Sequence, residues 1–355
     1  MSYQVTIEPL GHTIEVAEGQ TILDAALRSG IYLPHACCHG LCATCKVQVV
    51  DGEVDHGAAS PFALMDVERE EGRCLACCAV PMSDVVIEAD IDEEPDARHL
   101  PLKDYSGKVA DLVDLTPTIK GVFIEIEAEG MEFQAGQYVN LQLAGLEHPR
   151  AFSLSNQPGS KNLLELNVRH VPNGKGTTYI HEQLRVGDPV TMTGPLGRFF
   201  VRKSDTQPVI LMAGGSGLSS PRSMLLDLLE NDADPRKITL VYGARNRAEL
   251  YYHELFLDLA SRHPNFRYVP ALNEPTEACA WDGFKGFVHE AAAGAFSNDF
   301  RGHKAYLCGP PVMIEASIRA LMKGRLFERD IYTEKFITAG DGAHALARSP
   351  LFRNI

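Results

Sequence analysis

The sequence predicts a chain of three parts: a small α+β domain, an antiparallel barrel or sandwich, and a doubly wound α/β domain. The first indication is charge, because residues 1–97 hold 4 basic and 18 acidic side chains and so carry the whole net charge of −14. The second is a series of short, strand-like segments that continues to about residue 202. The third is an alternation of apolar strands with helices from about residue 207 onward.

The first part shows strands of alternating polarity in QVTIEP, HTIEVAE, CKVQVV and DVVIEAD. One amphipathic helix, TILDAALRSG, lies among them, and Thr21 with Asp24 has the spacing of a capping box. The acidic, proline-containing stretch 89–104 has no periodic apolar face and is typical of a linker. We therefore expect the first domain to cover residues 1–97.

Strands of the second part are expected in KGVFIEIEA, GQYVNLQL, RAFSLS, LLELNVRHV and PVTMTG, with one helix at TTYIHEQLR. In the third part PVILMAG, KITLVYGA and KAYLCG each precede a helix, which is typical of a parallel, doubly wound sheet. These patterns predict one domain at residues 104–203 and another at 204–336. The C-terminal tail, 337–355, has no clear pattern.

Composition narrows the class of protein. No apolar run approaches the roughly 20 residues of a membrane span, and the N-terminus lacks the basic start and apolar core of a signal peptide. Seven of the nine cysteines lie between Cys37 and Cys78, and clustered thiols in a reducing compartment bind metal more often than they form disulfides. We therefore expect a soluble, cytoplasmic protein. Its acidic first domain would repel nucleic acid, and it is either a docking face for a basic protein surface or a solvated face that aids solubility.

Four cysteines lie in HACCHGLCATCK, residues 35–46. Cys37, Cys42 and Cys45 have the C-x4-C-x2-C spacing that holds a 2Fe–2S cluster together with a fourth thiolate from farther along the chain. The candidates for the fourth ligand are Cys74, Cys77 and Cys78. A zinc site would more naturally show two C-x2-C pairs, and disulfides do not suit a reducing compartment. The spacing therefore predicts a 2Fe–2S cluster.

Two short segments of the second part could bind a flavin nucleotide. In Arg150-Ala151-Phe152-Ser153 the arginine can neutralise a pyrophosphate, the ring can stack on a flavin, and the serine can hydrogen-bond the reactive nitrogen. In NGKGTTYIHEQL, Gly174 and Gly176 precede a helix that begins near Thr177 and Thr178, which makes an anion site. Each segment taken alone also fits a buried strand or an ordinary helix cap. Together they favour FAD.

The third part offers a nicotinamide site. A buried strand runs into Gly214-Gly215-Ser216-Gly217 and then a helix, so that the backbone can approach a dinucleotide and the helix N-terminus its phosphates. Glu249 would repel a 2′-phosphate and could accept a ribose hydroxyl, which favours NADH. Arg245 and Arg247 argue for NADPH, because they could contact that phosphate. NADH is the prediction.

These segments also resemble known families. CLACCAVPMSDVVIE is similar to the last strand of plant-type ferredoxins, and this resemblance implies that Cys77 is the fourth cluster ligand. RAFS resembles the Arg-x-Tyr-Ser motif of the ferredoxin–NADP reductase superfamily, with Phe152 in place of the usual tyrosine. GGSG resembles the nicotinamide loop of that superfamily, and Cys308-Gly309-Pro310-Pro311 resembles the turn beside its nicotinamide.

The same resemblance implies several residue roles. The backbone of Val168 and Arg169 would contact FAD, and the aromatic ring that covers the flavin would be Phe336. Cys308 would be a positioning contact beside the nicotinamide. The catalytic residues that follow from the resemblance are Ser153, Cys308 and Phe336.

Cluster, flavin and nicotinamide motifs in this order resemble the reductase components of bacterial multicomponent oxygenases, among them the reductase of phenol hydroxylase. The resemblance implies a β-grasp ferredoxin domain, an antiparallel β-barrel FAD domain and a doubly wound parallel-sheet NAD domain. It also implies that electrons pass from NADH through FAD and the 2Fe–2S cluster to a di-iron oxygenase component, the partner, which hydroxylates an aromatic ring. Two alternatives stay open: the reductase of a Rieske ring-hydroxylating dioxygenase, and a redox-sensing carrier with a vestigial flavin site.

Overall fold

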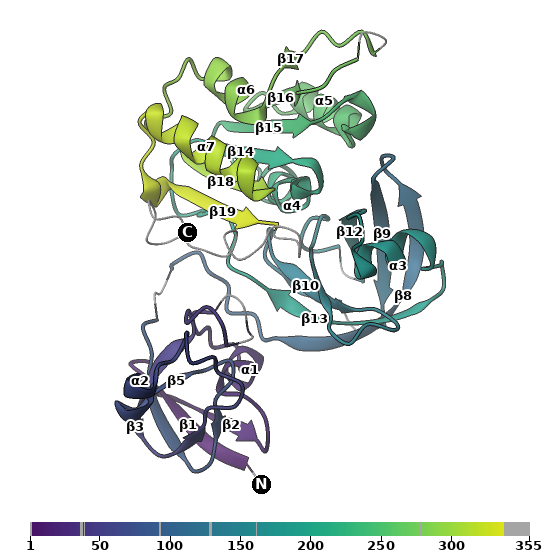
Figure 1. Ribbon diagram of the computed structural model, residues 1–355. Coiled ribbons are helices and arrows are strands. Elements are labelled where there is room, and N and C mark those ends of the chain that lie inside the picture. The colour runs from purple at the N-terminus through teal and green to yellow at the C-terminus, as the bar shows by residue number, and fades with distance from the viewer. Residues whose placement is uncertain are drawn as a thin grey trace. The chain divides into compact units, whose positions relative to one another are not determined.

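The computed structural model describes residues 2–35, 38, 40–91, 94–127, 130–160, 162–276 and 279–336. The chain divides into two compact units, Met1–Lys103 and Asp104–Ile355, and each is described by itself (Figure 1). The C-terminal tail, 337–355, lies outside the described residues. Within the described part of the chain, no helix combines the length and the hydropathy needed to span a membrane.

The first unit is a β-grasp domain built on a five-stranded sheet. Its strands are β1 (Ser2–Glu8), β2 (His12–Ala17), β3 (Lys46–Asp51), β5 (Arg73–Leu75) and β7 (Val85–Glu88). The sheet has the order β2-β1-β7-β3-β5, and β1 lies antiparallel to β2 but parallel to β7. The remaining elements are α1 (Ile22–Arg28), β4 (Val54–Asp55), α2 (Asp66–Glu70) and β6 (Val80–Pro81). Apolar side chains of α1 and of the sheet form one core.

The start of α1 lies where the sequence predicts it. Thr21 Oγ1 accepts a hydrogen bond from the Asp24 N–H at 3.3 Å, as an N-cap residue does. The Asp24 carboxylate is engaged elsewhere, because it accepts from Gln20 Nε2 at 2.7 Å and from Arg28 Nε at 3.0 Å. The capping box is therefore only half formed, since a charged partner one turn on competes for the carboxylate.

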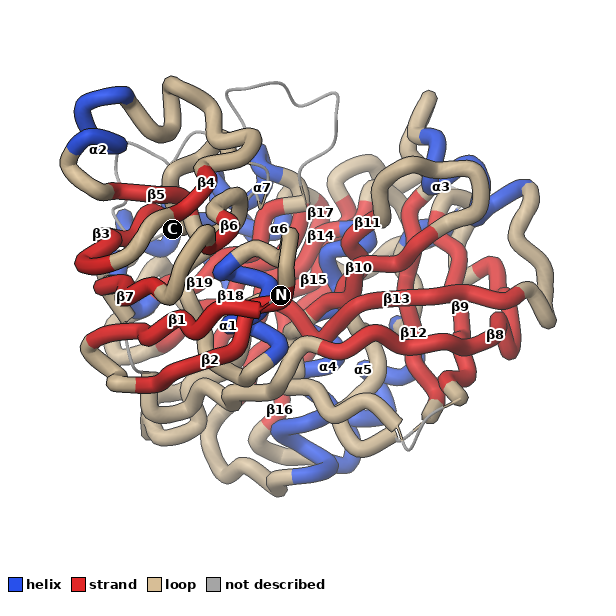
Figure 2. Tube along the Cα trace, turned by 90° about the horizontal axis from the view of Figure 1, so that it is seen from below, coloured by secondary structure: helices blue, strands red, loops and turns tan. Residues whose placement is uncertain are grey.

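The second unit begins with a six-stranded antiparallel barrel. Its elements are β8 (Lys103–Asp114), β9 (Ile119–Ile126), β10 (Tyr138–Gln142), β11 (Arg150–Ser153), β12 (Leu163–Arg169), α3 (Lys175–Glu182) and β13 (Pro189–Leu196). The strands, red in Figure 2, follow the order β11-β10-β13-β8-β9-β12. A bridge between Leu154 and Leu166 brings the chain after β11 against β12, so the sheet is nearly closed.

A doubly wound α/β domain follows in the same unit. Its strands are β14 (Val209–Gly214), β15 (Ile238–Ala244), β16 (Phe266–Leu272), β17 (Phe284–Lys285), β18 (Lys304–Gly309) and β19 (Ile331–Lys335). Its helices are α4 (Ser219–Leu226), α5 (His253–Arg262), α6 (Val288–Ala295) and α7 (Pro311–Lys323), with short helical turns at Gly215–Leu218, Asp227–Asn231, Arg247–Glu249 and Glu328–Asp330. The sheet is parallel and has the order β17-β16-β15-β14-β18-β19.

Alternating side chains of β14 pack into two separate hydrophobic cores, one on each face of the parallel sheet. The helices α4 and α5 lie on one face of this sheet and α6 and α7 on the other (Figure 1). Leu211 belongs to the core with side chains of α4 and α5, whereas Ile210 and Met212 belong to the core with α6 and α7. This arrangement and the two preceding domains confirm the predicted fold class. The sequence patterns do not predict α6, β17 or β19. The strand β19, IYTEK, is short and mixed in polarity, so it lacks the apolar run of a central parallel strand.

A buried polar network joins the barrel to the α/β domain. Arg222 of α4 donates to Glu165 Oε2 of β12 at 2.8 Å and to the Ser155 carbonyl at 2.7 Å. The Tyr252 hydroxyl donates to the other oxygen of Glu165 at 2.5 Å, and the guanidinium of Arg222 lies over the Tyr252 ring. The network runs from β12 of the barrel to α4 and Tyr252 of the α/β domain, and loss of the cation would leave the Glu165 charge buried and unpaired.

Candidate functional site

The cysteine loop lies between α1 and β3 of the first unit. Cys37 lies outside the described residues, whereas Cys42 is exposed and Cys45 is buried. The thiols of Cys45 and Cys77 share a hydrogen bond, and the Gly40 N–H donates to the Cys77 sulfur. The bond from Cys45 lowers the pKa of Cys77 to about 6. The same bond, together with burial, raises the pKa of Cys45. Two of the predicted ligands therefore face each other, and a backbone amide favours negative charge on one of them.

The other cysteines of this domain lie differently. Cys74 is fully buried in the core on β5, and burial raises its pKa to about 12. Cys78 lies near the loop, with its sulfur 3.7 Å from that of Cys77. Cys38 is exposed and has a positive φ of 56°. None of the described cysteines forms a disulfide. Of the three candidates for the fourth ligand, Cys77 is the one whose thiol is hydrogen-bonded to that of Cys45.

Gly40 gives the loop a tight path that a side chain would block. Its φ is +73°, and a Cβ there would lie 2.8 Å from the Cys78 sulfur and 3.0 Å from the Ala58 carbonyl oxygen. The Gly40 carbonyl accepts from the Ser60 N–H at 3.0 Å, which ties the loop to the segment that carries Phe62. Phe62 is 97% exposed and Leu41 65% exposed. The loop can therefore wrap closely around a cluster, and apolar side chains lie on the surface beside it.

In the barrel, the structure brings the two predicted flavin segments together. A Cβ on Gly176, in the first turn of α3, would lie 3.0 Å from Arg150 Cγ, so Arg150 lies against the start of this helix. Its guanidinium donates to the carbonyl of His148 at 2.8 Å. Phe152 packs against the barrel core. The stem of Arg150 therefore lies beside the first turn of α3, and a guanidinium and a helix N-terminus are both groups that can bind a pyrophosphate.

The threonines of this helix serve local structure. Thr177 Oγ1 accepts from the Val171 N–H at 3.1 Å, and Thr178 Oγ1 lies 3.5 Å from His170 Nε2. On the neighbouring strand, the carbonyl of Val168 lies 2.9 Å from His181 Nε2. The contacts that the sequence predicts between FAD and Val168, Arg169, Thr177 or Thr178 therefore stay predictions.

Two predicted catalytic residues meet at a third side chain that the sequence analysis misses. Glu334 Oε2, on β19, accepts from Ser220 Oγ at 2.6 Å, from Ser153 Oγ at 3.3 Å and from Cys308 Sγ at 3.4 Å. Burial raises the pKa of Glu334, against the opposing effect of these donors. Burial also raises the pKa of Cys308, so its sulfur stays a thiol and not a nucleophile. The Glu334 carboxyl is therefore a buried group that can take up a proton, and it contacts two hydroxyls and one thiol.

Phe336 lies two residues after Glu334 in the sequence. It follows β19, its N–H donates to the Gly309 carbonyl at 3.0 Å, and its ring packs on the core that contains Cys308. The signal that could have found Glu334 is an acid near the carboxyl end of the last strand, the edge where ligands of doubly wound sheets bind.

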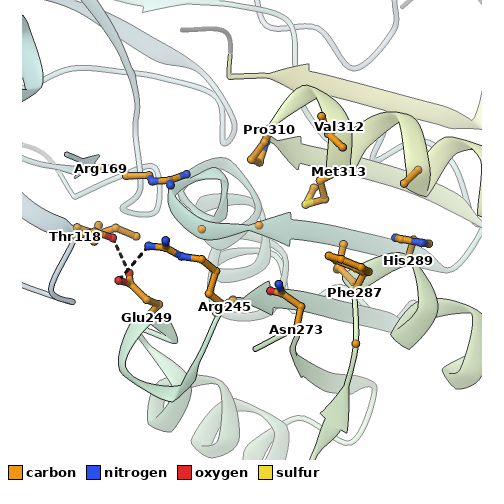
Figure 3. A pocket seen from close by; sticks show the side chains of 18 residues that line it. Thr118, Arg169, Arg245, Glu249, Asn273, Phe287, His289, Pro310, Val312 and Met313 are labelled. Atoms are coloured by element: carbon orange, nitrogen blue, oxygen red, sulfur yellow. Dashed lines mark hydrogen bonds and ion pairs between the residues drawn. The ribbon is translucent and has the colours of Figure 1, made fainter. Parts of the chain in front are cut away.

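At this edge a cavity of about 410 Å³ opens in the second unit (Figure 3). Its predicted lining residues are Arg169, Gly214, Gly215, Arg245, Glu249 and Pro310. Those that the sequence analysis misses are mainly Thr118, Asn273, Phe287, His289, Val312 and Met313. Asn273 directly follows β16, so the strand-end rule could have found it. Arg169, which the resemblance implies as a FAD contact, lines this cavity.

The glycine loop after β14 permits close packing at the cavity. A Cβ on Gly217 would lie 2.5 Å from the Cys308 carbonyl oxygen and 2.5 Å from Gly309 Cα. Only a glycine therefore lets this loop meet the turn after β18. The structure brings the predicted Gly214–Gly217 and Cys308–Pro311 segments together, and their meeting point fits a dinucleotide.

Glu249 lies at one wall of the cavity, between Thr118 and Arg245 (Figure 3). Its Oε2 accepts from Thr118 Oγ1 at 2.6 Å and from Thr116 Oγ1 at 3.0 Å, and its Oε1 pairs with Arg245 Nη2 at 3.5 Å. Arg247, the other candidate for a phosphate contact, instead pairs with Glu254 at 3.0 Å. A carboxylate in this position opposes a 2′-phosphate.

Three family models match the chain in the order of its domains. They describe a 2Fe–2S iron–sulfur cluster binding domain at residues 5–82, an oxidoreductase FAD-binding domain at 118–201 and an oxidoreductase NAD-binding domain at 211–318. These matches confirm the predicted cofactors: a 2Fe–2S cluster, FAD and NAD(H).

Curated relatives match along the whole chain. The reductase component of phenol 2-monooxygenase from Pseudomonas sp. (strain CF600) is 62% identical over 100% of both chains. The phenol hydroxylase P5 protein of Acinetobacter pittii (strain PHEA-2) is 59% identical, also over 100% of both. The crystal structure of the Amycolatopsis reductase GcoB has a TM-score of 0.82 at 36% identity and covers 94% of this chain and 98% of that one. The chain therefore belongs to the family of reductase components of bacterial multicomponent phenol hydroxylases.

Proposed function

We propose that the protein carries electrons from NADH to the oxygenase component of a phenol hydroxylase. The full-length identity to a phenol 2-monooxygenase component supports this partner. The observation that carries the redox part is the meeting of Ser153, Cys308 and Glu334 where the barrel and the α/β domain join. When bound, FAD and the 2Fe–2S cluster supply the conversion of a two-electron donor into one-electron carriers. We place the protein in the cytoplasm, where its clustered thiols stay reduced.

Cys37, Cys42, Cys45 and Cys77 hold the cluster in this proposal. The facing thiols of Cys45 and Cys77 and the Gly40 amide at the Cys77 sulfur support it. Amide hydrogen bonds to ligand sulfur also tune the potential of an iron–sulfur centre.

In the barrel, Arg150 and the first turn of α3 hold the FAD pyrophosphate. The contact of the Arg150 stem with this turn supports the assignment, because a guanidinium and a helix N-terminus both attract phosphate. Ser153 would hydrogen-bond the reactive edge of the flavin, and Phe336 would lie against its ring. Glu334 Oε2 accepts the Ser153 hydroxyl, so these two side chains can exchange a proton and Ser153 would be the donor that faces the flavin.

The cavity at the carboxyl edge of the parallel sheet takes NADH. Gly214–Gly217 lets the dinucleotide backbone approach, and Cys308–Pro311 positions the nicotinamide against the flavin site. Glu249 accepts a ribose hydroxyl and disfavours a 2′-phosphate. Arg245 would favour that phosphate, but its ion pair with Glu249 reduces its charge toward a ligand.

The partner docks on the first domain in this proposal. The domain carries the whole net charge of −14, and Phe62 and Leu41 are exposed beside the cysteine loop. An apolar centre within a charged rim is typical of a transient protein interface. Charge would steer the encounter, and the apolar side chains would seat the partner next to the cluster.

Reconstitution tests the proposed function. The purified chain, with FAD and its cluster, is mixed with the oxygenase component of a phenol hydroxylase, phenol, NADH and O₂, and hydroxylated product is measured. Product should form only when this chain is present. A parallel assay replaces the partner with the oxygenase component of a Rieske dioxygenase. Turnover in that assay, with none in the phenol hydroxylase assay, would contradict the assignment.

A further inference from the structure

Two threonines from the barrel grip the carboxylate of Glu249, which belongs to the α/β domain. Thr118 Oγ1 donates to Glu249 Oε2 at 2.6 Å and Thr116 Oγ1 donates to the same oxygen at 3.0 Å, across 131 and 133 residues of sequence. Thr116 also accepts from the N–H groups of Thr118 and Ile119, so it shapes the turn into β9. Thr118 lines the cavity itself. Its hydroxyl is therefore the contact that links the turn to the ligand site.

The two hydrogen bonds from Thr116 and Thr118 leave different room for further donors at the two oxygens of the Glu249 carboxylate. A carboxylate oxygen has two lone pairs, and the two threonine hydroxyls fill those of Oε2. Oε1 has a weaker contact, with Arg245 at 3.5 Å, and so retains room for another donor. Glu249 is only 9% exposed, so it cannot turn freely into solvent. The threonines present one defined carboxylate oxygen to the cavity.

We propose that Thr118 is a positioning residue for nucleotide selection. Its hydroxyl holds Glu249 so that Oε1 accepts a ribose hydroxyl of NADH and the carboxylate repels the 2′-phosphate of NADPH. This inference rests on the proposed role of Glu249, and it adds a contribution from the barrel to the nicotinamide site.

The position of Arg245 predicts how nucleotide binding changes when Thr118 no longer donates to Glu249. Its side chain is 49% exposed and its only contact with Glu249 is the 3.5 Å ion pair. Without the Thr118 hydroxyl, only the 3.0 Å hydrogen bond from Thr116 still holds Oε2, so the carboxylate can shift away from the ribose and the guanidinium can then meet a phosphate. Loosening Glu249 should therefore weaken NADH binding and improve NADPH binding at the same time. General damage to the fold would weaken both.

The test uses the full chain loaded with FAD and its cluster. The variants are Thr118→Val, Thr118→Ser and Glu249→Gln, with Thr193→Val as the matched control because Thr193 Oγ1 donates to Asp104 Oδ1 at 2.6 Å and does not line the cavity. Calorimetry gives Kd for NAD⁺ and NADP⁺, and ferricyanide reduction gives kcat/KM for NADH and NADPH. Thr118→Val should reduce the preference for the unphosphorylated nucleotide about tenfold, the effect of one hydrogen bond to a charged group. Thr118→Ser and Thr193→Val should keep it.

The outcomes separate the inference from its premise. If Glu249→Gln leaves the preference unchanged, the proposed role of Glu249 is wrong and the inference fails with it. If Glu249→Gln lowers the preference but Thr118→Val does not, only the role of Thr118 is overturned. If Thr118→Val weakens NAD⁺ and NADP⁺ equally, Thr118 is merely structural and the inference is again overturned.

Discussion

The two units of this protein build their sites in different ways. In the first unit, the proposed cluster ligands come from one short loop and one residue beyond β5, and their spacing is visible in the sequence. In the second unit, Ser153 and Glu334 share a hydrogen bond although 181 residues separate them. The described part of the cysteine loop has an exposed Cys42 and a buried Cys45, whereas the second unit relies on buried polar contacts between two domains. The ligands of a site within one loop can be predicted from their spacing in the sequence. The residues of a site formed by distant segments can be found only once the fold is known.

The largest effect is expected from removing a proposed cluster ligand in the first unit. Cys77→Ser should abolish the cluster, because three thiolates cannot complete two tetrahedral irons. Iron content and visible absorbance of the purified variant measure the loss. Cys74→Ala is the matched control, since this buried thiol lies in the core, and it should retain a full cluster. A full cluster in Cys77→Ser would show that the fourth ligand is another residue.

The next effect breaks the contact between the two domains of the second unit. Arg222→Met leaves Glu165 buried without its cation, which should lower the free energy of unfolding by about 3 kcal/mol. Chemical unfolding followed by flavin fluorescence should report it. Arg301→Met, which removes an exposed ion pair with Asp299, should leave the midpoint unchanged. Equal midpoints for both variants would mean that the buried network does not hold the domains together.

Glu334 tests the assembled site directly. Glu334→Gln keeps the shape of the side chain but cannot exchange a proton, so we expect NADH-dependent flavin reduction to slow at least about tenfold. Stopped-flow absorbance measures that rate. Glu315→Gln removes a carboxylate that pairs with Lys335 away from the Ser153 contact, and it should react normally. An unchanged rate in Glu334→Gln would remove the proton-holding role.

The same residue gives a pH dependence of stability. Burial raises the pKa of Glu334, so above the ordinary range of a glutamate the folded chain holds a proton that the unfolded chain has lost. Stability should therefore fall as pH rises from the ordinary value to the raised one. Unfolding measured across this window should show a smaller slope in Glu334→Gln. A steeper slope in the variant would contradict the raised pKa.

The smallest effect concerns the docking face. Phe62→Ser should raise the KM for the oxygenase component about tenfold, because a 97% exposed ring at an interface centre is a typical anchor. Ferricyanide reduction should not fall. Val50→Ser, at an exposed position farther along β3, serves as the control. If both variants dock equally well, the apolar centre lies elsewhere on the domain.

Sequence patterns predict much of this molecule because its strongest signals are local. The cysteine spacing, the GGSG loop and the strand–helix alternation each lie within one segment, and the family matches confirm the domains they indicate. The sequence patterns do not predict the site roles of Glu334, Thr118 and Asn273. Each of these residues joins a site only because another element packs beside it. Glu334 lies on a short edge strand of mixed polarity, and Thr118 lies in a turn before a barrel strand.

The central claim is that one chain takes electrons from NADH and delivers them through a flavin to an iron–sulfur cluster. An anaerobic titration with NADH, followed by visible absorbance, tests it most directly. We expect three electrons to be taken up per chain, two by FAD and one by the cluster, with both sets of bands bleaching. Uptake of two electrons with no change in the iron–sulfur bands would contradict the account, because the cluster would then not receive electrons from the flavin.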